Sequence, residues 1–348
     1  MGWVEGTVRV RVSATSANLG PGFDALGLAL ALHDDVEAWI MGSGHSIEIS
    51  GEGADLAGVG EAHLVLRAMR AAFDVTGGQP PGIGLRCVNR IPHGRGLGSS
   101  AAAIVAGILA ARSLTEKGPS ELPPDAVLEL ATSIEGHPDN VAACLGGGLT
   151  IAWMVAGHPR MVRLEPLPWI KPVVCIAPSP VRTDVTRGLL PDVVPHKDAA
   201  ANAARSALLV AALTQQGAVT AGGACEGTLA GAEASSGQMD EWALAGARAS
   251  LLFDATQDWL HQDYRAAAMP QTYALVRGLR AAGIPAVVSG AGPSVLAFPG
   301  VPGRPGSRHH LDSLGSIVRE TGIAWHISSL DVEREGARVL RPESSPGC

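Results

Sequence analysis

The stretch from Pro92 to Leu114 reads PHGRGLGSSAAAIVAGILAARSL, a glycine-rich loop that runs into a strongly helix-favouring segment. Gly94, Gly96 and Gly98 allow tight backbone turns with exposed N–H groups. The start of a helix presents unpaired N–H donors and the positive end of the helix dipole, which suits a phosphate group. The alternative is an ordinary helix with Ser99 as its N-cap. The loop lacks the Lys-Ser/Thr ending of a P-loop and the spacing of a dinucleotide fingerprint.

Glycine is abundant along the whole chain, with 44 of 348 residues against an average near ~7%. The chain is 46% hydrophobic and 17% charged, which excludes a disordered protein and predicts a large core. A net charge of −7 without a basic cluster argues against binding of nucleic acid or an anionic membrane. No apolar run is long enough to span a membrane, and we expect a cytoplasmic protein. The five cysteines form no CxxC pair and are interpreted as reduced thiols: Cys87, Cys144, Cys175, Cys225 and Cys348.

The first half of the chain predicts a mixture of strands and helices. TVRVRV at 7–12 alternates strictly, with Val8, Val10 and Val12 on one face. Residues 25–40 fit a helix or a strand, with strand favoured, and the first 50 residues together predict mainly antiparallel sheet. The remaining elements expected here are strands at 46–50, 83–91 and 146–155 and helices at 61–74, 99–114, 125–135 and 137–143.

The second half adds a buried strand at 173–177 and strands at 285–290 and 295–298, with helices at 199–213, 243–261 and 270–282. Residues 214–240 are small, polar and without periodicity, and are interpreted as a mobile surface insertion. The tail after residue 340 is expected to be disordered. The absence of regular βαβ alternation favours the α+β class over a doubly wound parallel sheet.

Two further glycine-rich turns strengthen the case for a binding site. SANLGPGFDALG at 16–27 carries Asn18 and Asp24, and SGAGPSVLAF at 289–298 is a second sharp turn between strands. Three glycine loops, each at a strand end, predict one shared binding cleft.

Four blocks of the sequence resemble the GHMP kinase superfamily, and among its members the homoserine kinases most closely. They are VSATSANLGPGFDALGLAL at 12–30, PHGRGLGSSAAA at 92–103, EGHPDNVAACLGGG at 135–148 and VVSGAGPSVLAF at 287–298. The blocks occur in the family's order, and with weaker matches the resemblance covers about residues 7–300.

The resemblance implies an N-terminal domain of the ribosomal protein S5 domain 2 type at 1–160 and a C-terminal ferredoxin-like domain at 161–335, followed by a tail at 336–348. It implies a cytoplasmic homodimer that uses ATP and Mg²⁺ to phosphorylate the hydroxyl of L-homoserine, in threonine biosynthesis. No nucleic acid or membrane partner is expected. The alternative within the superfamily is a kinase for a mevalonate-type or sugar substrate.

The resemblance also implies roles for individual residues. Asn18 and Glu135 are the catalytic candidates, and Ser99, or Ser100, with Glu135 would hold Mg²⁺. Five residues would surround homoserine: Asn18, Asp24, His137, Arg187 and Arg265. Asp24 would bind its ammonium group, and the two arginines would bind its carboxylate. The nucleotide would contact His63 and the loop Pro92, His93, Gly94, Arg95, Gly96, Leu97, Gly98, Ser99, Ser100, Ala101 and Ala102.

Several of these residues have plain structural alternatives. Glu135 alone fits a solvated carboxylate at a helix end, and Arg187 and Arg265 alone fit surface arginines. His63 stands where many relatives have an asparagine that holds the nucleotide base, so it either makes a similar contact or lies on a helix surface. A kinase scaffold that has lost its chemistry and serves as a nucleotide sensor, and a nicotinamide-dependent dehydrogenase, are the competing classes.

Overall fold

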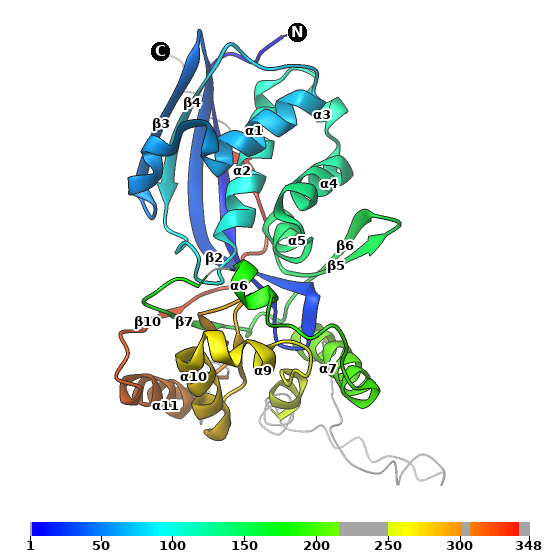
Figure 1. Cartoon of the computed structure of the whole chain (residues 1–348), viewed down its shortest axis with the longest axis vertical. Coiled ribbons are helices and arrows are strands. Elements are labelled where there is room, and N and C mark those ends of the chain that lie inside the picture. The colour runs from blue at the N-terminus through cyan, green and yellow to red at the C-terminus, as the bar shows by residue number, and fades with distance from the viewer. Residues whose placement is uncertain (1, 182, 216–249, 301–306, 341–348) are drawn as a thin grey trace.

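The computed structural model describes residues 2–181, 183–215, 250–300 and 307–340, in which two sheets organise the chain (Figure 1). The first sheet has seven strands, in the order β11-β1-β2-β4-β3, with β5 paired to β2 and β6 paired to β5. The second sheet has four strands, in the order β10-β7-β9-β8. Helices pack against both sheets, which makes the protein α+β, as predicted.

Two long antiparallel strands, β1 (Thr7–Asn18) and β2 (Gly22–Met41), form the centre of the first sheet. Val10 and Val12 are buried and Val8 is half-buried, so the alternation at 7–12 faces the core as predicted. Residues 25–40 are strand rather than helix. The prediction of an antiparallel arrangement is wrong for β3 (Gly44–Gly51), which pairs parallel with β4 (Gly82–Asn89). A helical crossover joins these two strands, and such a connection is what parallel neighbours require.

Helices cover one face of the first sheet. The crossover contains the 3-10 helix η1 (Ala54–Ala62) and α1 (Leu64–Val75), so the helix predicted at 61–74 begins three residues later. The α2 helix (Ser99–Leu114) packs against α1 and β1, with most of its alanines buried. It is followed by α3 (Gly118–Glu121), α4 (Pro124–Glu135), α5 (Asp139–Gly146) and the hairpin of β5 (Leu149–Val155) and β6 (His158–Leu164).

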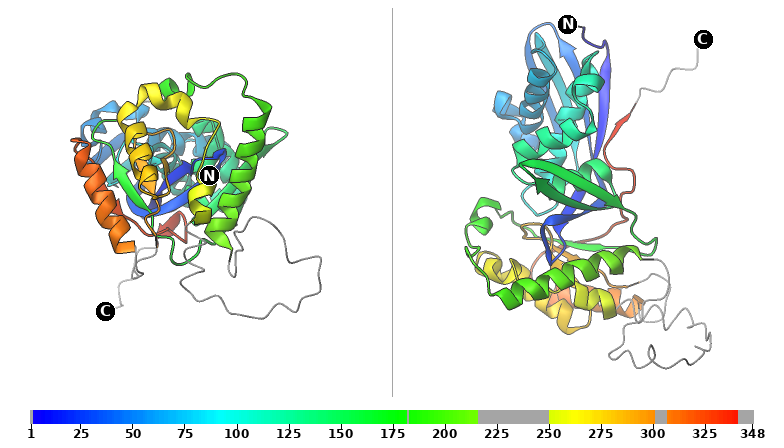
Figure 2. Two further views of the ribbon diagram at one scale, coloured as in Figure 1. Left: turned by 90° about the horizontal axis from the view of Figure 1, so that it is seen from below. Right: turned by 90° about the vertical axis from the view of Figure 1, so that its right-hand side faces the viewer.

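The second sheet consists of β7 (Val173–Ile176), β8 (Ala286–Val288), β9 (Val295–Ala297) and β10 (His326–Ser329), all paired antiparallel. A separate apolar core forms where α10 (Pro270–Ala281) and α11 (Ser307–Glu320) cover one face of this sheet (Figure 2). The other helices described are α6 (Thr183–Arg187), α7 (His196–Thr214), α9 (Gln262–Arg265) and η2 (Ala266–Ala268).

The helix predicted at 243–261 ends early. Residues 250–255 are helical, and residues 243–249 lie outside the described residues. The carboxylate of Asp258 accepts hydrogen bonds from the backbone N–H groups of Leu260, His261 and Gln262, so it opens the short helix α9 instead of continuing the earlier one. This break matters for function because α9 carries Arg265.

The chain returns to the first sheet at its end, where β11 (Arg338–Leu340) pairs with β1. The predicted domain boundaries at 160/161 and 335/336 stay predictions, although β6 and β11 both belong to the first sheet. The proposed insertion, from residue 216 onward, and the tail after 340 lie outside the described residues.

Three of the five cysteines, Cys87, Cys144 and Cys175, are buried free thiols, whereas Cys225 and Cys348 fall outside the described ranges. Burial raises the pKa of each of the three to about 12. In the parts of the chain that the structure describes, no helix is long and apolar enough to cross a membrane.

Candidate active site

The three glycine loops meet between the two sheets. Asn18 donates from Nδ2 to the carbonyl oxygen of Gly290 at 2.9 Å, and Ser289 donates from Oγ to that of Gly96 at 2.6 Å. A pocket of about 450 Å³ opens at this junction and is lined by Asn18, Gly96 and Gly290 among others. The expected shared cleft is therefore present, and α6 lies across it from the N-terminal end of α2 (Figure 1).

The loop before α2 presents backbone rather than side chains to the pocket. Gly94, Gly96 and Gly98 have φ values of 64°, 71° and 69°, in the left-handed region that favours glycine. A Cβ on Gly96 would overlap the carbonyl oxygen of Ser289, so this position tolerates only glycine. Hydrogen bonding inside the helix begins at Ala102, whose N–H donates to Gly98. The preceding amides of the first turn are available to an anion, as the phosphate-loop prediction requires.

The side chains of this loop diverge. Ser99 and Ser100 line the pocket, His93 lines an adjoining one, and Leu97 and Ala101 are buried in the core. Arg95 turns away and donates to the carbonyl oxygens of Ala177 at 2.9 Å and Pro178 at 3.1 Å, so its guanidinium ties the loop to the second sheet. Pro92 lines a separate hollow beside Arg95. The predicted nucleotide contacts of Pro92, Arg95, Leu97 and Ala101 can therefore come only from their backbone.

The turn between β1 and β2 holds the predicted substrate residues in a constrained backbone. Asn18 and Asp24 have φ values of 67° and 54°, which asparagine and aspartate adopt more readily than most residues. The Asn18 side chain fixes the turn, because its Oδ1 accepts a hydrogen bond from the backbone N–H of Asp24 at 2.9 Å. Arg187, which lines the pocket, donates to both carboxylate oxygens of Asp24, at 2.6 and 3.1 Å. The structure thus pairs two residues that were expected to bind different charged groups of the substrate, Asp24 the ammonium group and Arg187 the carboxylate.

Arg265 is almost fully buried in the site, with 1% of its surface exposed. Its Nη1 lies 3.2 Å from Nδ1 of His261, its guanidinium lies 5.3 Å from the ring centre of Phe23, and its Nε has no hydrogen-bond partner in the described structure. Burial, and then the neighbouring charge of Arg187, lowers the pKa of Arg265 from 12.5 to about 10. No carboxylate among the described residues pairs with this buried cation, so the site favours an anionic ligand there.

His261 supports Arg265 from behind. Its Nε2 lies 2.8 Å from the carbonyl oxygen of Gly20, which can only accept, so the ring nitrogen facing Arg265 is the acceptor. Burial lowers the pKa of His261 and favours this neutral form. The ring of Phe23 stacks on the imidazole, with ring centres 5.2 Å apart.

Glu135 and His137 form the far wall of the pocket. Glu135 ends α4, and its carboxylate accepts a hydrogen bond from Ser100 Oγ at 2.7 Å. Burial raises the pKa of Glu135, and the nearby charge of Asp139 adds to the rise. For His137, burial opposes the charged form, but the hydrogen bond of 2.6 Å to Asp139 and the negative charges of Asp139 and Glu135 together outweigh it and raise its pKa.

Glu135 and Ser100 are the residues best placed to hold a divalent metal ion. They present a carboxylate and a hydroxyl oxygen, and Mg²⁺ commonly takes one or two such protein ligands and completes its shell with water and substrate phosphates. No cluster of three or more His, Cys, Asp or Glu side chains that could hold a metal by itself occurs within the described ranges. Of the two serines considered from the sequence, Ser99 lines the pocket and Ser100 makes the hydrogen bond to Glu135.

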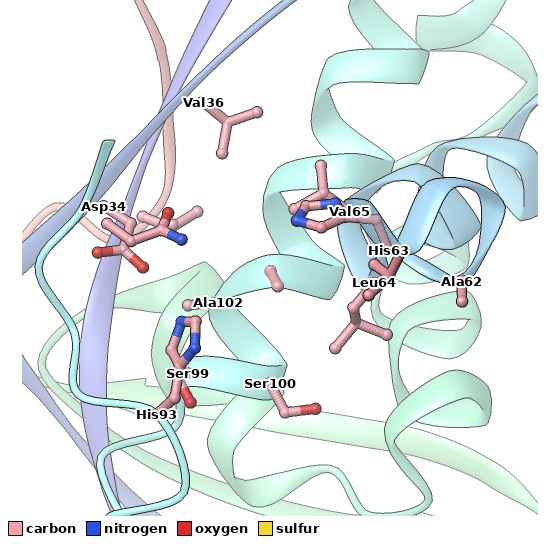
Figure 3. Close-up of a pocket in the computed structure, with 14 residues that line it drawn as sticks. Asp34, Val36, Ala62, His63, Leu64, Val65, His93, Ser99, Ser100 and Ala102 are labelled. Carbon is pink, nitrogen blue, oxygen red and sulfur yellow. The ribbon is translucent and has the colours of Figure 1, made fainter. Parts of the chain in front are cut away.

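A second pocket, of about 360 Å³, adjoins the first and shares Leu64, Ser99 and Ser100 with it (Figure 3). His63 and Val65, at the start of α1, lie across this pocket from Asp34 and Val36 on β2. The lining is mainly apolar: Val12, Asp34, Val36, Val59, Ala62, His63, Leu64, Val65, Asn89, His93, Ser99, Ser100, Ala102 and Ala103. An apolar pocket with a few polar groups beside a phosphate loop suits a nucleobase.

His63 is buried at the rim of this second pocket, with 9% of its surface exposed. Its Nδ1 is buried without a hydrogen-bond partner in the described structure. Burial, and then the charge of His93, lowers the pKa of His63, so the ring is neutral near pH 7. The alternative that His63 lies on an exposed helix surface is therefore wrong. Its unpaired Nδ1 can accept or donate one hydrogen bond to a ligand.

Among the residues of the site that were not predicted from the sequence, four make or support its polar contacts. Asp139 lies inside the block at 135–148, two residues after His137, and His261 lies four residues before Arg265, so the roles expected for these neighbours were the available signal. Ser289 precedes the third glycine turn, and Thr183 lines the pocket one turn before Arg187. These residues reach the site through contacts with segments distant in sequence or through the spacing of residues along a helix. Local sequence motifs do not show such contacts.

Comparison with known proteins identifies the family. Residues 63–148 match the model of the GHMP kinases N-terminal domain, and residues 241–322 match that of the GHMP kinases C-terminal domain. The chain is 50% identical to a homoserine kinase of Streptomyces coelicolor, over 96% of this chain and 94% of the relative, and 51% identical to one of Streptomyces avermitilis, over 96% and 95%.

Solved structures show the same fold. A homoserine kinase from Cytophaga hutchinsonii superposes with a TM-score of 0.72 at 22% identity, covering 98% of this chain and 99% of that one. Since relatives this similar span nearly the entire chain, the protein is a member of the homoserine kinase family within the GHMP kinases.

Proposed function

We propose that this protein transfers the γ-phosphate of ATP to the side-chain hydroxyl of L-homoserine and releases O-phospho-L-homoserine and ADP. One observation carries the proposal beyond family membership. A phosphate-binding helix start and the unneutralised, buried cation of Arg265 line a single pocket, and Asp24 lies at its edge, bound to Arg187. These groups match a γ-phosphate, an amino-acid carboxylate and an ammonium group.

ATP would lie across both pockets. Its base fits the apolar second pocket, where the free Nδ1 of His63 offers a hydrogen bond, and its phosphates fit the first-turn amides of α2. Ser99 and Ser100 line both pockets and therefore lie where the base-ribose part and the phosphates join.

Mg²⁺ would be held by Glu135 and Ser100, with Ser99 nearby. The ion would neutralise charge on the phosphate oxygens. Glu135 fits this role because its half-buried carboxylate has no cation in direct contact, a state that partial burial disfavours, as its raised pKa indicates.

Homoserine would place its carboxylate against Arg265 and Arg187 and its ammonium group against Asp24. An amide nitrogen carries two donors, and Asn18 uses one of them on Gly290. The second donor is free to orient the substrate hydroxyl. His137, held by Asp139, would line the same end of the pocket.

Phosphoryl transfer of this kind depends mainly on alignment and charge neutralisation. Asn18 has no basicity and Asp24 is ion-paired, so neither is suited to remove the hydroxyl proton. We therefore propose catalysis by positioning, with the proton leaving through a phosphate oxygen. If Asn18→Ala or Asp24→Ala left turnover at saturating homoserine unchanged, these assignments would be wrong.

A coupled assay of ADP release with Mg-ATP tests the activity, using L-homoserine, L-serine, L-threonine and mevalonate in parallel. We expect turnover with L-homoserine far above the others, because mevalonate has no ammonium group for Asp24 and L-serine is one carbon shorter. Equal or greater turnover with mevalonate would favour the alternative superfamily substrate instead. The expected cytoplasmic homodimer is a separate proposal, which light scattering after size-exclusion chromatography would test.

A further inference from the structure

The ion pair of Asp24 and Arg187 lies at the edge of the first pocket, which Arg187 lines. The two residues are 163 positions apart in the chain and come from different halves of the fold, Asp24 from β2 and Arg187 from α6. The guanidinium binds both carboxylate oxygens, and each side chain is 36% exposed. The Asp24 carboxylate and the Arg187 guanidinium therefore already neutralise each other. In the proposed function, each of these two groups binds the substrate instead.

Arg265 differs from Arg187 in this respect. It is almost fully buried and has no carboxylate partner in the described structure, whereas Arg187 reaches the pocket from a short helix and is half-exposed. Both guanidinium groups lie against the ring of Phe23, at 5.3 Å for Arg265 and 5.8 Å for Arg187. A carboxylate bound at Arg265 is consequently within reach of Arg187, if Arg187 releases Asp24.

We propose that the Asp24–Arg187 pair is an internal substitute for the substrate's charged head group. Only a ligand that carries both an ammonium group and a carboxylate replaces this pair without leaving Asp24 or Arg187 unpaired. This inference rests on the proposed function, because it assigns the same residues to the same groups of the substrate. It adds that binding replaces an existing pair, which makes Asp24 and Arg187 a joint determinant of specificity.

The argument is one of charge balance. When an amino-acid head group enters, Arg187 exchanges the Asp24 carboxylate for the ligand's, and Asp24 exchanges a guanidinium for an ammonium group. Each protein charge keeps one partner throughout. A ligand with only one charge breaks the pair and leaves the other protein charge unpaired in a partly desolvated pocket, which weakens its binding. The site thereby rejects simple alcohols, amines and hydroxy acids.

Two analogues isolate the two charges. 4-Hydroxybutyrate keeps the carboxylate and hydroxyl of homoserine, and 3-aminopropan-1-ol keeps the ammonium group and hydroxyl. We expect each to bind the wild-type protein at least about 30-fold more weakly than L-homoserine, in calorimetric titrations with Mg²⁺ and a non-hydrolysable ATP analogue present.

Single variants should then each strengthen the binding of the one analogue that matches the charge they leave unpaired. Asp24→Asn preserves the left-handed backbone, which asparagine tolerates, and frees Arg187. We expect it to bind 4-hydroxybutyrate about 2- to 5-fold more tightly than the wild type does, the range expected for losing a half-exposed ion pair, and to bind L-homoserine more weakly. Arg187→Gln frees Asp24, so we expect it to bind 3-aminopropan-1-ol about 2- to 5-fold more tightly than the wild type does and L-homoserine more weakly. An analogue affinity that falls or stays constant in its matching variant overturns the proposal.

A second measurement distinguishes two explanations for tighter 4-hydroxybutyrate binding by Asp24→Asn. One is loss of the direct Asp24–Arg187 ion pair, and the other is removal of long-range repulsion between Asp24 and the ligand carboxylate. The single variants and the double variant are unfolded in urea without ligand and with saturating L-homoserine. We expect a favourable coupling without ligand of about 2- to 5-fold in the folding equilibrium constant, which disappears when homoserine is bound. Zero coupling in the ligand-free protein would refute the pairing even if the affinities changed as expected.

Controls distinguish this inference from the proposed function. Glu48→Gln removes a more exposed ion-pair partner of Arg86 outside the pocket and should alter neither the analogue affinities nor homoserine turnover. If the wild-type protein fails to phosphorylate L-homoserine, the proposed function is wrong. If it phosphorylates L-homoserine but neither variant binds its matching analogue more tightly, only the exchange of the ion pair is wrong.

Discussion

Replacing Arg265 by methionine tests whether this buried arginine serves the substrate or the fold. Methionine keeps an unbranched side chain of similar reach and removes the charge. The guanidinium is 1% exposed and its contacts in the described structure are one hydrogen bond, to His261, and the face of Phe23. A structural arginine at such depth would have a carboxylate partner, whereas this one has an unsatisfied Nε.

The expected effect on the free energy of unfolding follows from the lowered pKa of Arg265. A fall from 12.5 to about 10 corresponds to on the order of 3 kcal/mol against the charged form in the folded protein, and solvent in the open pocket reduces this cost. The cost applies at every pH below about 10, because the arginine is charged there in both the folded and unfolded states, and it fades as pH rises from 10 towards 12.5. Loss of the His261 hydrogen bond and the ring contact removes about 1–3 kcal/mol of favourable energy.

The two effects nearly cancel, so we expect Arg265→Met to change the free energy of unfolding by less than about 1 kcal/mol at pH 7 in urea titrations. Binding should change far more. Loss of charge-assisted hydrogen bonds to a buried carboxylate costs about 2–4 kcal/mol, which predicts a KM for L-homoserine about 30- to 1000-fold higher in the coupled assay. Saturating L-homoserine should stabilise the wild-type protein against urea and leave the variant unaffected.

Arg265→Lys is the matched control, because it keeps the charge but not the planar fork, and we expect an intermediate KM. The opposite pattern would refute the reasoning. If Arg265→Met lost more than about 2 kcal/mol of stability and kept its KM for homoserine, Arg265 would be a structural residue whose partner is the protein itself.

The other predictions concern the nucleotide and the metal ion. Gly96→Ala, which forces a Cβ onto the Ser289 carbonyl at a φ of 71°, should raise the KM for ATP at least about tenfold in steady-state kinetics while the homoserine affinity changes less. Glu135→Gln should lower kcat by about 100-fold or more and raise the Mg²⁺ concentration needed for half-maximal activity. In the wild type, this requirement should increase on acidification already above pH 4.5, because the raised pKa of Glu135 makes its carboxylate protonate earlier than an ordinary glutamate. His63→Ala should raise the KM for ATP several-fold and leave that for homoserine unchanged, and equal KM values for ATP would place the base elsewhere.

Much of the site was predictable from local sequence because its backbone chemistry is local. The left-handed glycines of the phosphate loop, the start of α2 and the buried alternation of β1 all depend on residues within a few positions of one another. Those features follow from rules of conformation that apply to any chain. The same locality makes the turn carrying Asn18 and Asp24 recognisable from its residues alone.

Pairings between distant segments were not predictable in the same way. Arg95 belongs to the phosphate loop in sequence, yet its side chain binds the carbonyl groups that follow β7, because the second sheet lies directly behind the loop. The parallel pairing of β3 with β4 is decided by the crossover helix, and the burial of Arg265 is decided by α9 packing under Phe23. Each outcome depends on tertiary geometry that single-sequence patterns do not encode.

The charges that this site leaves unsatisfied also indicate what it binds. Arg265 has its pKa lowered and Glu135 has its pKa raised, so in each case burial disfavours the charged state. An anion beside Arg265 and a cation beside Glu135 would each reverse that penalty, and the two positions line one pocket. A folded protein keeps such costs where ligands offset them. We therefore propose that the sign of each charge orients the reaction: the amino-acid carboxylate would lie at the Arg265 end, the metal and phosphates at the Glu135 end, and the hydroxyl to be phosphorylated between them, near Asn18.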